Sequence, residues 1–132
     1  MKPRFRAWDK EIKMMIEISL IDFEMHVIRG THWKFGETES IKFNDIELMQ
    51  STGMVDKNGV EIFEGDVVRM RNPRDRRQIG MFQVVRVANS PMLGLLDKKL
   101  TTEIFNLYEH MSNYYEVKGN IYENPDLLEA IK

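Results

Sequence analysis

Apolar and polar residues alternate with a period of two along much of the chain. The alternation runs through residues 12–20 and is most regular in residues 115–121. Because this period places alternate side chains on opposite faces of a strand, it predicts a mainly β protein. Residues 5–8 and 12–14 are expected to form an opening hairpin, and residues 23–27 a further strand.

Turn residues divide the strands in the middle of the chain. Residues 56–59 are the strongest turn signal, because Asn58 and Gly59 tolerate the positive φ of a type I′ hairpin turn. Gly65, which stands between two acidic residues, predicts a sharp bend before the next strand. Short strands joined by such corners favour a small SH3-like barrel in the C-terminal part.

Three further segments depart from simple alternation. A change of phase near residues 44–45 predicts a β-bulge. Apolar residues at helical spacing in residues 101–111 predict a short helix, although a strand also fits them. Asn124 has the character of an N-cap and Pro125 that of a first helical residue, so a second short helix is expected there.

Composition and length limit the possible domain organisation, partners and cellular location of the chain. The 132 residues fit a single domain, with an N-terminal β lobe at about residues 1–50 and a C-terminal barrel lobe at about residues 51–132. The net charge is −2, so any contact with nucleic acid must come from a local basic patch. The chain has no cysteine, no secretion signal and no apolar run of about 18 residues, and we expect a cytoplasmic protein that makes no membrane contact.

Three segments, residues 5–9, 48–68 and 119–128, occur together in a distinctive order. The matching positions within them are Trp8, Gly53, Asn58, Gly59, Gly65, Asp66, Gly119, Asn124 and Pro125. In this order they resemble the YopX family of phage and prophage proteins. The resemblance implies a mainly β fold with a C-terminal barrel, a phage or prophage origin in a bacterial host, and self-association into a homo-oligomer. It implies no reaction, and the glycines and Asn124-Pro125 are explained by turns and a helix start.

An arginine cluster is the sharpest candidate for a functional site. Its members are Arg69, Arg71, Arg74, Arg76 and Arg77, opposed within the cluster only by Asp75. Guanidinium groups bind phosphates through paired hydrogen bonds, so a loop of this kind is able to contact nucleic acid or another polyanion. A solvated loop whose arginines pair with acidic surface is at least as good an explanation. No aromatic residue for base stacking stands beside the cluster, which favours phosphate contact without base readout.

Other chemistry has weaker support in the sequence. Glu61, Glu64 and Asp66 surround the predicted corner and suggest an acid/base pair or a cation site, but such residues usually bond the amides of their own turn. The three histidines, His26, His32 and His110, lack the spacing of a metal site. We expect no metal, no cofactor and no catalytic residue.

The expected function is therefore that of a phage or prophage accessory protein that binds without turnover. Its partners would be further copies of itself and a host or phage macromolecule. One alternative is a nucleic-acid-binding module that uses residues 69–77, and a second is a carboxylate-dependent hydrolase that uses Glu61, Glu64 and Asp66.

Overall fold

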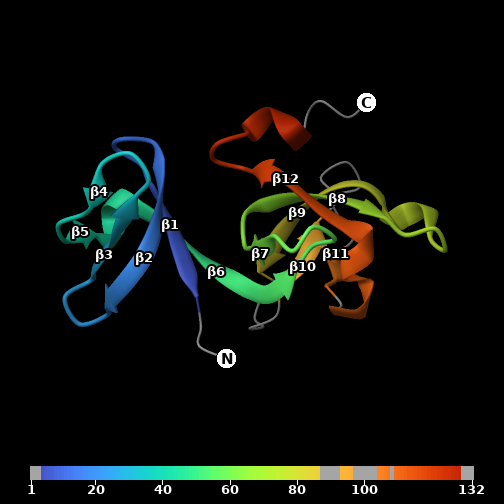
Figure 1. The fold of residues 1–132 in the computed structure, drawn as a ribbon, viewed down its shortest axis with the longest axis horizontal. Helices are drawn as coiled ribbons and strands as arrows, with labels where there is room; N and C mark the ends of the chain where they lie inside the picture. Colours follow the sequence, from blue (N-terminus) through green and yellow to red (C-terminus); the bar gives the residue numbers. More distant parts are fainter. Residues whose placement is uncertain (1–3, 87–92, 97–103, 108, 129–132) are drawn as a thin grey trace. The chain divides into compact units, whose positions relative to one another are not determined.

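A computed structural model of the chain describes residues 4–86, 93–96, 104–107 and 109–128 (Figure 1). The described residues form antiparallel sheets joined by turns and short 3-10 helices, which confirms the mainly β prediction. None of these helices is long and apolar enough to cross a membrane. The chain divides into two compact units, Met1–Ser51 and Thr52–Lys132.

The first unit is an antiparallel sheet with β1 near its centre. Its elements are β1 (Phe5–Asp9), β2 (Met14–Asp22), β3 (Val27–His32), β4 (Gly36–Glu37), β5 (Ile41–Lys42), the 3-10 helix η1 (Phe43–Asp45) and the first part of β6 (Ile46–Val55). β1 pairs with β2 on one side and with β6 on the other, and β3 pairs with β2, β4 and β5. Ala7, Ile16, Ile28 and Ile46 form its buried core.

The structure confirms an opening hairpin of β1 and β2, but residues 12 and 13 belong to its turn and the return strand begins at Met14. It also corrects two other expectations in this unit. Residues 23–26 form the turn between β2 and β3 instead of a strand. The Asp22 carboxylate accepts hydrogen bonds from the amides of Glu24 (3.0 Å) and Met25 (2.9 Å), and so removes them from strand pairing. Near residues 44–45, the 3-10 helix η1 changes the phase of the chain in place of the expected bulge.

The second unit contains a five-stranded antiparallel sheet in the order β11-β10-β9-β8-β12. Its elements after the end of β6 are β7 (Glu61–Phe63), β8 (Asp66–Arg71), η2 (Arg76–Gln78), β9 (Ile79–Arg86), β10 (Leu93–Leu96), β11 (Ile104–Asn106), η3 (Glu109–Tyr114), β12 (Tyr115–Asn120) and η4 (Pro125–Leu128). The core contains Ile62, Val68, Met70, Phe82, Val84 and Tyr115.

In the described residues the sheet is more open than the expected barrel. The helices are shorter than expected. β11 and β12 stand at opposite ends of the sheet order, and the described residues show no closed barrel. The helix expected over residues 101–111 is replaced by strand β11 and the 3-10 helix η3, while residues 101–103 and 108 lie outside the described residues. The C-terminal helix is the 3-10 helix η4, and Pro125 is its first residue as expected.

The hairpin of β6 and β7 has a different turn from the predicted one. The Gly59 amide donates to the Asp56 carbonyl (3.1 Å), and among the described residues of this turn only Gly59 has a positive φ, of 80°. A type I′ turn needs positive φ at two consecutive residues, so the geometry instead matches a type I turn followed by a left-handed glycine. The Asp56 carboxylate favours this form, because it accepts from the amides of Asn58 (2.8 Å) and Val60 (2.9 Å).

Two glycines of the matching segments occupy positions that other residues would not fit. Gly65 has a φ of 88° at the bend between β7 and β8, where its amide donates to the Val84 carbonyl (2.9 Å). Gly119 lies in β12, and a Cβ atom there would stand 2.3 Å from Oδ1 of Asn124. Asn124 does not cap its helix in the expected way, since Oδ1 accepts from the Asn120 amide (3.3 Å).

Candidate functional site

The β8–β9 hairpin presents the arginine cluster, and it is drawn in yellow-green in Figure 1. Val68 and Met70 of β8 point into the core, so the alternation places Arg69 and Arg71 on the other face of the sheet. In the register of the hairpin, Arg69 is opposite Met81 and Arg71 is opposite Ile79. The connecting loop is therefore shorter than the sequence suggested, because two of the five arginines belong to the strand.

Internal hydrogen bonds hold the loop between β8 and β9. The Asn72 amide donates to the Gln78 carbonyl (3.1 Å), and the Gln78 amide donates to the Asp75 carbonyl (3.0 Å). Oδ1 of Asn72 accepts from the Arg74 amide at 3.0 Å. These bonds give the loop one defined backbone, so its side chains are displayed from fixed positions.

Arg77 contacts Asp75 of its own loop and Phe105 of β11. Its Nε donates to Oδ1 of Asp75 (3.2 Å) and its Nη2 donates to Oδ2 (2.9 Å), while its guanidinium lies 5.7 Å from the centre of the Phe105 ring. The side-chain and backbone hydrogen bonds from Arg77 hold the pKa of the Asp75 carboxyl below its ordinary value. Arg77 is therefore an exposed residue whose guanidinium is held by Asp75 within the hairpin.

Three other arginines of the cluster are exposed like Arg77, whose side chain is 61% exposed, but among the described residues they are not held in an ion pair. Arg71, Arg74 and Arg76 are exposed, and none of them forms an ion pair within the part of the chain that the structure describes. Arg69 is half-buried and lies opposite Glu116 of β12. The predicted cluster of five is therefore divided into a strand pair, two exposed loop residues and one residue bonded inside the loop.

The sequence did not reveal that β12 and η4 complete this surface. Arg69 and Arg71 line a groove of about 690 Å³ together with Ile79, Met81, Lys118 and Leu127. Lys118 lines the groove because β12 pairs with β8. Leu127 lines it because η4 lies against Gly119. The outward phase of each strand was visible in the alternation, but the pairing of β8 with β12 was not.

Glu116 moderates the positive charge of this face. Its Oε1 lies 3.1 Å from Nζ of Lys118 and 3.8 Å from Nζ of Lys57. The hydrogen bond from Lys118, with the nearby charges of Lys57 and Arg69, keeps the pKa of the Glu116 carboxyl below its ordinary value. Glu116 therefore remains ionised at neutral pH and offsets one positive charge on this face.

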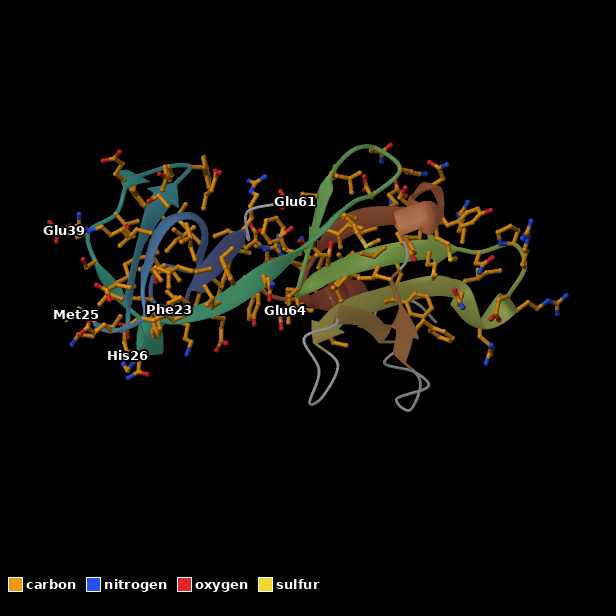
Figure 2. All side chains as sticks on the ribbon, turned by 90° about the horizontal axis from the view of Figure 1, so that it is seen from below. Phe23, Met25, His26, Glu39, Glu61 and Glu64 are labelled. Carbon is orange, nitrogen blue, oxygen red and sulfur yellow. The ribbon has the colours of Figure 1, made fainter. Side chains whose placement is uncertain are left out.

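The carboxylates of the β7–β8 corner do not converge. Asp66 is 1% exposed, and its Oδ2 accepts a hydrogen bond from the Phe63 amide (2.7 Å). Figure 2 shows Glu61 and Glu64 at separate places on the second unit. Within the described residues, no three His, Asp or Glu side chains gather in a way that would hold a metal ion. This geometry suits a corner that Asp66 stabilises, and it gives the hydrolase interpretation little support.

The remaining residues singled out from the sequence lie in the first unit. Trp8 is a half-buried residue of β1. His26 is exposed in the β2–β3 turn beside Phe23 and Met25, as Figure 2 shows, whereas His32 is buried with Nε2 3.7 Å from Oδ2 of Asp9. The side chain of His110 lies outside the described residues.

Comparison with known proteins gives a family and a similar solved structure. The crystal structure of protein EF1440 from Enterococcus faecalis is similar to this chain, with 30% identity and a TM-score of 0.64 over 97% of this chain and 99% of that one. No curated protein matches the chain. The family model described as YopX protein matches residues 4–129, which is nearly the whole sequence. The chain therefore belongs to the YopX family.

Proposed function

We propose that this chain is a phage or prophage accessory protein of the bacterial cytoplasm that acts by binding a macromolecule, without turnover. The observation that supports this function best is the display of Arg71, Arg74 and Arg76 on the β8–β9 hairpin. All three are exposed and make no ion pair among the described residues, so the fold itself gains no ionic contact from them.

The rigidity of the hairpin strengthens this proposal. Binding costs less free energy when the contacting groups already hold their bound arrangement. The hydrogen bonds of Asn72, Asp75 and Gln78 hold the backbone that carries Arg74 and Arg76. A guanidinium group also has a fixed planar fork of donors, which suits carboxylates and phosphates.

Affinity capture from a bacterial lysate tests the proposal. The tagged chain is compared with a double variant in which Arg74→Gln and Arg76→Gln are combined. The matched control combines Lys34→Gln and Lys42→Gln, which removes the same charge from exposed positions of the first unit. We expect a partner that is retained by the chain and by the control but lost by the arginine variant. A partner retained equally by all three proteins would contradict the proposed site.

Nucleic acid is the second candidate for the partner, and the same three arginines favour it. If each neutralises one phosphate, affinity for duplex DNA should fall roughly 40-fold between 50 and 200 mM salt, because the release of each counterion gains less free energy as the salt concentration rises. Fluorescence anisotropy with a labelled duplex and a labelled single strand measures this dependence. Affinity that is undetectable at low salt, or that does not change in the Arg74 and Arg76 double variant, would exclude this candidate.

We also propose that the chain self-associates through its first unit. The support is two groups of large apolar side chains that stay exposed at the two ends of β3, Phe23 and Met25 in the turn before it and Trp33 and Phe35 in the turn after it. Trp33 is 82% exposed and is the most accessible of them. Light scattering after size exclusion should report an oligomer that Trp33→Ser weakens. A monomer at micromolar concentration would refute the proposal.

A further inference from the structure

The groove on the outer face of the second unit is lined by both apolar and basic side chains. Ile79, Met81 and Leu127 provide the apolar surface, and Arg69, Arg71 and Lys118 provide the cations. Ile79 is 53% exposed, although it begins a strand whose Phe82 and Val84 are fully buried. With Met81 and Leu127 it forms an apolar patch next to charged groups, and such patches are typical of surfaces that a partner covers.

We propose that this groove binds an acidic peptide segment that carries apolar side chains. The inference rests on the proposed binding function and adds a surface with its own partner chemistry. Peptide carboxylates would accept hydrogen bonds from the guanidinium groups of Arg69 and Arg71, and an apolar peptide side chain would cover Ile79 and Met81.

The positive charge of the groove favours a negatively charged ligand. Three cations line it, and Glu116 is the neighbouring carboxylate, with Oε1 3.1 Å from Nζ of Lys118. Glu116 thus offsets mainly Lys118, whereas Arg71 has no ion pair among the described residues. The groove keeps a net positive charge, which is complementary to an acidic segment.

The apolar part of the groove lining favours a peptide over a nucleic acid. Single-stranded nucleic acids gain much of their affinity by stacking bases on aromatic rings, and none of the residues that line the groove is aromatic. A phosphate backbone would contact the arginines but would gain little from Ile79, Met81 and Leu127. A peptide is able to use both parts of the surface at once.

Selection from a random displayed peptide library, with the full chain as target, tests the inference. We expect the selected peptides to be enriched in Asp and Glu together with Leu, Ile or Phe. A labelled synthetic copy of a selected peptide is then titrated by fluorescence anisotropy. Ile79→Ser and Arg69→Gln should each weaken its binding roughly tenfold. Glu116→Gln should strengthen binding, because it removes the carboxylate beside the groove.

The controls separate this inference from misfolding and from the proposed function. Arg29→Gln removes the same charge from an exposed position of β3 in the first unit and should leave peptide affinity unchanged. Thermal unfolding followed by circular dichroism verifies that each variant folds. Selected peptides without acidic enrichment, or with equal affinity for the Ile79→Ser and Arg69→Gln variants, would overturn the inference. If a captured partner still depended on Arg74 and Arg76, the proposed function would stand without the groove.

Discussion

The carboxylate of Asp56 accepts a hydrogen bond from the backbone amide of Val117 at 2.8 Å, although the two residues are 61 positions apart in the chain. The neighbouring Lys57 amide donates to the Tyr115 carbonyl at 3.0 Å. The turn between β6 and β7 therefore satisfies backbone groups of β12, much as another strand would. Asp56 is 3% exposed and also accepts from the amides of Asn58 and Val60 within its own turn.

Asp56→Ala should lower the free energy of unfolding by about 3 kcal/mol or more. The change leaves the Val117 amide without its acceptor, and a buried unsatisfied donor costs about 1–3 kcal/mol. It also removes the bonds to the amides of the exposed residues Asn58 and Val60, each worth about 0.5–1.5 kcal/mol. Denaturant unfolding measures the loss. Asp126→Ala, at an exposed position of the same unit, is the matched control and should change stability by less than about 0.5 kcal/mol. Equal losses in the two variants would show that the Asp56 contacts contribute nothing special.

The stability of the protein should also depend on pH through Asp56. Burial tends to raise the pKa of this carboxyl, but the hydrogen bonds from Val117, Val60 and Asn58, with the charge of Lys57, outweigh burial and lower it. A carboxyl with a lowered pKa in the folded state stabilises the fold fully above its unfolded pKa of about 3.9. This contribution is lost as the pH falls through the folded pKa. Unfolding measured from pH 6 downward should show a shallower decline in Asp56→Asn, and parallel curves would contradict the assignment.

Lys13→Gly should stabilise the β1–β2 hairpin by up to about 1 kcal/mol. Lys13 has a φ of 55°, which costs a residue with a Cβ atom roughly 1–2 kcal/mol and costs glycine little. Part of the gain is offset by the greater freedom of glycine in the unfolded chain. Glu11→Gly is the control, because Glu11 is exposed in the same turn and has no positive φ, so this change should destabilise. Thermal melting of both variants decides whether the strain at Lys13 is real.

Gly119→Ala should destabilise the second unit by about 1–3 kcal/mol. A Cβ atom at this position would stand 2.3 Å from Oδ1 of Asn124 and 2.9 Å from Cδ1 of Leu127. Removing the first obstacle by Asn124→Ala should recover part of the loss, so the double variant should be more stable than the sum of the two single changes predicts. Strictly additive effects in denaturant unfolding would show that the close approach of Asn124 does not limit residue 119.

The local elements could be predicted wherever periodicity or a turn residue acted alone. The alternation of residues 115–121 predicted β12, the polar residues after β1 predicted the opening hairpin, and Gly65 predicted the bend before β8. Predictions were wrong where a side chain competed for backbone amides. Asp22 turns residues 23–26 out of a strand, and Asp56 selects a turn other than type I′.

For the arginine cluster too, one part was predictable from the sequence and another depends on the tertiary structure. Its basic character is a property of the sequence, but the bonding of Arg77 to Asp75 depends on the short 3-10 helix η2, where Asp75 is the N-cap. The joining of Arg69 and Arg71 with Lys118 depends on the pairing of β8 with β12. A period of two tells which side chains share a face of one strand, and it carries no information on which strands become neighbours.

By itself, the amino-acid sequence determined the strand periods, the glycine corners and the family of this chain, because these depend on local backbone preference and on the order of residues. Only the tertiary structure decided which arginines stay exposed, that Asp56 reaches Val117, and that an apolar groove lies between Arg69 and Lys118. Those features arise from strand pairing between segments far apart in the chain, which burial of the shared core selects.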